Sequence, residues 1–172
     1  MLKMTPKDVP FAERIAAVYP RLVTASSQIN KASDELAKAT IPIEAILKKL
    51  NLGVPTWTQI SGNEADDGHY WSRDVGYTKV GGDWGLALRT TNGHNSFEDS
   101  HREEVWPFNE APRWLRVEGV GKLPDLLETL VKRADETTKK IQGKAKQASE
   151  IAAALAAAAE KQRDLDGSDS EA

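Results

Sequence analysis

The two ends of this chain carry apolar residues at every seventh position, and this spacing constrains the fold more than any other feature. Seven-residue periodicity is typical of helices that pack side by side. Within residues 122–163 it forms one column made of Leu127, Ala134, Ile141, Ala148 and Leu155. A second column, three residues further on, consists of Leu130, Thr137, Lys144, Ile151 and Ala158, and a third of Val131, Thr138, Ala145, Ala152 and Ala159. The pattern predicts one long helix with a broad apolar stripe.

A matching stripe begins near the N-terminus. One column contains Ile15, Leu22, Ile29 and Leu36, and the other contains Phe11, Val18, Ala25, Ala32 and Ala39. Two such helices at opposite chain ends predict an antiparallel hairpin, a coiled-coil stalk that holds the middle of the chain out as a head. The second stripe is broader than the first, so a further surface must cover it. A short helix, the head or a second copy of the chain would serve.

The N-terminal segment, residues 1–52, predicts two helices. Asp8 is a suitable N-cap for the first, and Pro20 inside it predicts a bend or short break on the outer face. Thr40 followed by Pro42 predicts the start of a second, shorter helix that ends at Gly53.

Residues 53–121 contain all the tryptophans and read as β structure. Residues 56–60 are rich in β-branched and aromatic side chains, and residues 70–79 alternate as a strand does. A Gly-Gly-Asp turn at 81–83 leads to a returning strand at 84–89, which predicts a hairpin. Polar loops are expected at 62–68 and 92–104, with an edge strand at 105–108. Residues 110–120 favour a helix because of Pro112 in the first turn, although Leu115 and Val117 also fit a strand.

The predicted fold is therefore α+β. A small antiparallel meander of three or four strands (53–121) is inserted between the N-terminal helices (1–52) and a long C-terminal helix (122–163), and residues 164–172 form a disordered acidic tail. With no cysteine and a net charge of −3, disulfides and Cys-ligated zinc are excluded, and no strong attraction to nucleic acid is indicated. The absence of a secretory pattern or a long apolar run predicts a cytoplasmic protein without membrane contact.

The density of tryptophan in the head favours a protein interface. Exposed Trp, Tyr and Arg are enriched at such surfaces, although bulky aromatics also fill small cores. The candidate partner-binding residues are Trp71, Tyr77, Trp106, Trp114 and Arg113.

A histidine- and carboxylate-rich loop suggests a second reading, that of a small metal-dependent or acid–base enzyme. Its candidate ligands are His94, Asp99, His101 and Glu103. Their spacing matches no known ligand motif, which favours solvated loop residues, and no cofactor is expected.

A third reading is nucleic-acid binding through the lysine-rich part of the long helix, residues 132–146. Acidic side chains interspersed there, and an acidic head, disfavour it. The sequence thus predicts a non-enzymatic interaction or scaffolding protein. Its aromatic head would face a protein partner, and its spare apolar stripe would support a homodimer.

Overall fold

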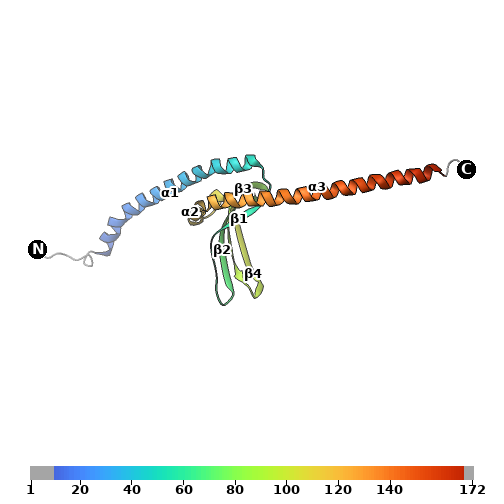
Figure 1. Cartoon of the computed structure of the whole chain (residues 1–172). Helices are drawn as coiled ribbons and strands as arrows, with labels where there is room; N and C mark the ends of the chain where they lie inside the picture. Colours follow the sequence, from blue (N-terminus) through green and yellow to red (C-terminus); the bar gives the residue numbers. More distant parts are fainter. Residues whose placement is uncertain (1–9, 169–172) are drawn as a thin grey trace.

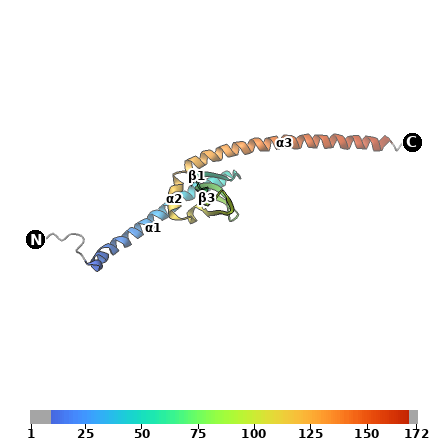
Figure 2. The same cartoon turned by 90° about the horizontal axis from the view of Figure 1, so that it is seen from below.

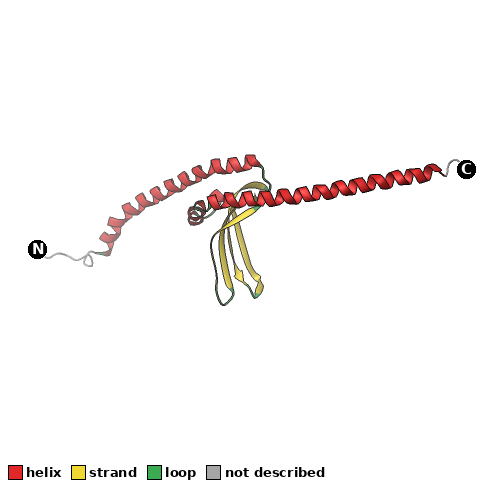
Figure 3. Ribbon diagram, viewed as in Figure 1, coloured by secondary structure: helices red, strands yellow, loops and turns green. Residues whose placement is uncertain are grey.

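The computed structural model describes residues 10–168 as a small α+β head from which two long helices project (Figure 1). The helices are α1 (Phe11–Leu50), α2 (Arg113–Val120) and α3 (Leu123–Ser168), with a short 3-10 turn η1 (Phe108–Glu110) before α2. The strands are β1 (Thr56–Glu64), β2 (His69–Val80), β3 (Asp83–His94) and β4 (Phe97–Pro107). The predicted antiparallel meander between terminal helices is therefore confirmed (Figure 3).

The sheet has the simplest antiparallel topology, with strand order β1-β2-β3-β4. Val80 pairs with Asp83 across a two-residue turn. The turn residues, Gly81 and Gly82, have φ values of 61° and 98°. Positive φ at both central positions is what a tight hairpin of right-handed twist requires, and glycine adopts it without steric cost. The β2–β3 hairpin is thus fixed by local sequence.

The core lies where one face of the sheet meets the helices. Val75 pairs with Leu88, and Tyr77 with Leu86, and all four side chains are buried. The helical side contributes Leu47 from α1, Leu115 from α2 and, from α3, Leu123, Leu126 and Leu130. Helix α2 approaches the sheet closely, since a Cβ on Gly119 would lie 2.7 Å from Leu88 Cδ2. Apolar side chains from all three helices therefore close over one end of the sheet.

Helix α1 is continuous, so the predicted break before residue 41 is wrong. Pro42 lies inside the helix, as does Pro20. Contacts with the head hold the chain on either side of Pro42, because Thr40 is buried and its hydroxyl donates to Asn109 Oδ1 at 3.0 Å. Tertiary packing here outweighs the backbone bond that proline removes. The N-cap expected at Asp8 lies outside the described residues.

Two arginines of α2 also form hydrogen bonds with side chains of α1. Arg113 Nη2 donates to Asn30 Oδ1 and Arg116 Nη2 to Ser33 Oγ, each at 2.8 Å. Residues three apart lie on one side of a helix, so a pair on α2 meets a pair on α1.

The predicted coiled-coil stalk is not confirmed. Helices α1 and α3 lie near each other only at the head and then extend toward opposite ends of the molecule, as two perpendicular views show (Figures 1 and 2). The physical reason is that the head covers the part of each helix next to it, through Leu47 near the end of α1 and through Leu126 and Leu130 near the beginning of α3. Within one chain, the outer helices are left to diverge.

The loop predicted at 92–104 is mostly strand, and the first three residues of the loop predicted at 62–68 belong to β1. Strand β1 continues to Glu64, and β3 and β4 form a long hairpin that turns at residues 95–96. This hairpin projects beyond the helices, so both of its faces can be polar and the alternation typical of a half-buried strand is missing. The edge strand predicted at 105–108 is confirmed for residues 105–107 in β4, whereas Phe108 begins η1. The helix predicted at 110–120 is confirmed as α2 from Arg113.

Helix α3 continues to Ser168 and so includes the first five residues of the segment predicted as a disordered acidic tail, 164–172; residues 169–172 lie outside the described residues. Within residues 10–168, no helix combines the length and the apolar character that a membrane span needs.

Candidate interaction site

Trp71 and Trp114 meet on the head around the guanidinium of Arg73. Its Cζ atom lies 4.8 Å from the ring centroid of Trp71 and 4.5 Å from that of Trp114, within the range of cation–π attraction. Arg73 Nη1 also donates to both carboxylate oxygens of Glu118, at 3.2 and 3.3 Å. Trp71 is 39% exposed and Trp114 46% exposed. We call these four residues the aromatic surface.

Two shallow hollows flank the aromatic surface, and Trp71 and Arg73 line both. One, of about 440 Å³, also touches Ile60, Ser61 and Lys122. The Ser61 hydroxyl oxygen there is buried and has no hydrogen-bond partner among the described residues. The other hollow, of about 200 Å³, adjoins Thr90, Asn92 and Trp114. The aromatic surface thus combines exposed aromatic rings with two shallow hollows that are partly polar.

The remaining predicted interface residues lie elsewhere. Tyr77 is buried, stacks on Trp84 at 5.3 Å, and donates its hydroxyl hydrogen to Leu47 O at 3.2 Å. Its burial raises the pKa of the Tyr77 hydroxyl above the ordinary value. Trp106 is partly buried against the core, and Arg113 is used in holding α1. Of the predicted set, only Trp71 and Trp114 meet.

Arg73 and Glu118 were missed by the sequence analysis. A signal for Arg73 was present, because it is two residues from Trp71 and therefore points to the same face of β2. Glu118 carried no such signal, since its approach depends on how α2 packs against the sheet.

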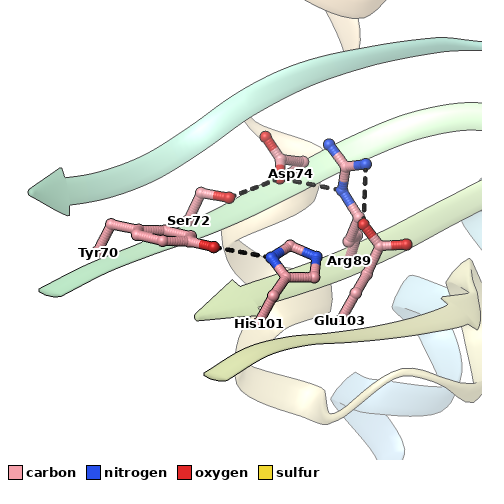
Figure 4. A network of polar contacts seen from close by, with 6 residues as sticks. All are labelled: Tyr70, Ser72, Asp74, Arg89, His101 and Glu103. Carbon is pink, nitrogen blue, oxygen red and sulfur yellow. Dashed lines mark hydrogen bonds and ion pairs between the residues drawn. The ribbon is translucent and has the colours of Figure 1, made fainter. Parts of the chain in front are cut away.

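The predicted metal or acid–base residues do not converge. His101 Nδ1 hydrogen-bonds with Tyr70 Oη at 2.7 Å, and Glu103 Oε2 accepts from Arg89 Nη1 at 3.3 Å (Figure 4). His94 Nδ1 instead accepts from the backbone N–H of Ser96 at 3.1 Å, and Asp99 is exposed. In the described part of the chain, no group of three or more His, Asp or Glu side chains is placed to hold a metal ion.

Arg89 lies at the centre of the larger of the two sets of polar contacts drawn in Figure 4, and from β3 it contacts residues of the other three strands. Its Nε donates to Asp74 Oδ2 at 3.2 Å and its Nη1 to Glu103, while its Cζ lies 4.3 Å from the Trp57 ring. Ser72 also donates to Asp74, which is 6% exposed. A buried carboxylate needs such partners, so this network stabilises the sheet face opposite the core.

The tip of the hairpins holds a smaller polar cluster. The backbone N–H of His69 donates to Asp67 Oδ1 at 3.0 Å, and His69 Nδ1 lies 3.1 Å from Asp67 Oδ2. These two hydrogen bonds, the backbone one first, lower the pKa of the Asp67 carboxyl. They shape the β1–β2 turn at the edge of the sheet.

The largest apolar feature is the outer part of each long helix. We define the α1 outer arm as residues 11–32 and the α3 outer arm as residues 138–163, since every residue in these ranges is exposed. On the stripe columns these arms expose Phe11, Ile15, Val18, Leu22, Ile29, Ile141, Ile151 and Leu155. Lys132, Lys139 and Lys146 lie on the opposite side of α3 from Ile141 and Ala148, where they face solvent, whereas Lys144 lies on the stripe.

Comparison with known proteins adds no further restriction on the site. No family model matches the chain, and neither the curated proteins nor the solved structures gave a significant match.

Proposed function

We propose that this chain is a non-enzymatic scaffolding protein that associates with copies of itself through its two helical arms. The observation that supports this is the exposure of large apolar side chains in a seven-residue repeat along both outer arms. Monomeric proteins rarely leave an extended apolar stripe open to water, and such stripes usually mark an interface. Each Val, Leu, Ile or Phe side chain that becomes fully buried contributes about 1.5–3 kcal/mol.

The test is the mass of the full chain in solution. Light scattering coupled to size-exclusion chromatography should give a multiple of the single-chain mass of 18.9 kDa, falling toward that value on dilution. The double variant Leu22→Gln/Leu155→Gln should shift the equilibrium toward single chains, because it places amides on both stripes. Val23→Gln, next to the stripe, is the matched control and should leave the mass unchanged. A single-chain mass at every concentration would contradict the proposal.

The head supplies a second contact, the aromatic surface. The charge of Arg73 is already neutralised by Glu118, and both indole rings are partly exposed. This combination suits an uncharged, apolar peptide segment of a protein partner better than an acidic one.

Selection from a random peptide library on the immobilised chain tests this contact. Enrichment of apolar peptides that is lost in Trp71→Ala and kept in Trp57→Phe, on the other sheet face, would support it. Enrichment of acidic peptides, or of peptides that bind Trp71→Ala equally well, would contradict it.

A further inference from the structure

We infer that the α1 outer arm of each copy packs antiparallel against the α3 outer arm of a second copy, and that the two copies exchange these contacts reciprocally. This inference rests on the proposed self-association and specifies which surfaces meet, in which direction and in which register.

The apolar face of each outer arm continues a face that already makes contacts near the head. The column of Ile15, Leu22, Ile29 and Leu36 in α1 continues to Ile43, and Leu36 and Ile43 are both partly buried. The stripe of α3 likewise begins with buried Leu130 and partly buried Ala134 and Thr137. Each outer arm therefore extends a face that is an interface near the head and lacks only a cover further out.

The two outer arms match in length and register. In an antiparallel pair, each column of one helix faces the other column of its partner. Setting Leu22 against Ile151 aligns residues 11–32 with 141–162, so that one exposed arm faces the other along its whole length. The facing layers are then Ile15–Ala158, Val18–Leu155, Leu22–Ile151, Ala25–Ala148, Ile29–Lys144 and Ala32–Ile141.

The six layers are apolar at every position but one, and two of them pair a large side chain with a small one. Ile15 and Ile141 each meet an alanine, and two alanines meet each other in the middle. Pairing large with small side chains lets helices approach closely without voids. Only Lys144 places a charged group among the layers, and a single polar residue at such a position is a known device for fixing register at some cost in stability.

The directions of the two arms point to a second copy of the chain as the surface that covers them. The arms leave the head toward opposite ends of the molecule, so one chain does not bring its own arms together (Figures 1 and 2). A two-fold pair gives every arm a partner, as closed symmetric assemblies do. With a contact strip about 33 Å long and 10 Å wide on each of four arms, the pair would bury about 1,300 Å², in the range of specific interfaces, roughly 1,200–2,000 Å².

Disulfide trapping in the full chain tests this arrangement, and the chain is suited to it because it contains no cysteine. The double variant Ala25→Cys/Ala148→Cys should give a covalent dimer on non-reducing electrophoresis after mild oxidation. Each single variant should stay uncrosslinked, because Ala25 then faces Ala148 and not its own copy. The matched control is Ser27→Cys/Ala153→Cys, whose positions lie on the outer side of each helix and should form no dimer.

The alternatives give different patterns. A dimer from Ala148→Cys alone would mean that α3 pairs with α3, and a dimer from Ala25→Cys alone would mean that α1 pairs with α1. A double variant that forms its disulfide within one chain, and therefore gives no covalent dimer, would place the pairing within one chain. A ladder of larger products would mean an open assembly. Each of these four results overturns the inference, although light scattering would still report association for α3–α3 pairing, α1–α1 pairing and an open assembly. A single-chain mass by light scattering would overturn the proposed function as well.

Discussion

The inner and outer parts of the two long helices both carry apolar side chains on one face but differ in how far these side chains are buried. Near the head, Leu47 of α1 and Leu126 and Leu130 of α3 are buried in the core. Further out, Leu22, Ile141 and Leu155 lie on the apolar stripes and are exposed by 61%, 63% and 67%. The difference shows that a helical repeat predicts which face of a helix becomes buried. The surface that buries this face depends on how the rest of the chain is arranged.

Two adjacent leucines of α3 test whether burial in the head decides how much a side chain stabilises the fold. Leu126 is 0% exposed and Leu127 is 42% exposed. Leu126→Ala should lower the free energy of unfolding by about 2–5 kcal/mol, because it removes buried methyl groups and leaves a cavity. Leu127→Ala should cost much less. Chemical denaturation of both variants measures the difference, and equal losses would show that burial in the head does not decide which leucine stabilises the fold.

The outer stripe makes the opposite prediction. Leu22→Ala should leave the unfolding of the head unchanged and weaken self-association by roughly tenfold or more, since each leucine side chain buried in the pair contributes about 1.5–3 kcal/mol. Val23→Ala, one residue off the stripe, provides the control. Sedimentation of both variants over a concentration series gives the dissociation constants. A Leu22→Ala chain that associates as tightly as Val23→Ala would remove the outer stripe from the interface.

The polar layer of the outer stripe allows the association to be strengthened. Lys144→Leu replaces the charge that faces Ile29 in the inferred register and should tighten the pair by about tenfold. Lys139→Leu lies on the outer side of α3 and should have little effect on affinity. The same sedimentation series compares them. Weaker association of the Lys144→Leu chain would contradict this register.

The smallest effect concerns the anchor between α1 and the sheet. Tyr77→Phe should cost roughly 0.5–1.5 kcal/mol, because Leu47 O loses a buried donor. Burial raises the pKa of Tyr77 in the folded chain, so its stabilising contribution is complete below the unfolded pKa of about 10 and is lost as pH rises above it. Denaturation at about pH 8 and pH 11 should show a steeper loss for the natural chain than for Tyr77→Phe. Parallel losses would argue against this coupling.

The sequence predicted those parts of the fold that are set by local pattern. The β2–β3 hairpin follows from Gly81 and Gly82, and the extent of α3 follows from its repeat. Pro42 misled the prediction because its effect was judged without the Thr40–Asn109 contact. The strands within 92–104 escaped detection because a hairpin that is polar on both faces lacks alternation.

The aromatic surface could be predicted only in part, for a similar reason. Trp71 and Arg73 share a strand face, which spacing reveals. Trp114 and Glu118 reach them only through the packing of α2 on the sheet, and no local pattern encodes that approach. Tyr77, chosen for its residue type, lies in the core because its strand position faces the helices.

The grip of α2 on α1 has a consequence for how two copies would meet. Arg113 and Arg116 hold Asn30 and Ser33 at the point where the α1 outer arm begins. The helix extends about 28 Å beyond Asn30 and acts as a lever, so a small rotation at these two bonds displaces its tip by many ångströms. The short helix α2 therefore sets the direction of the α1 outer arm, and changes confined to α2 would redirect this arm without altering any of its residues.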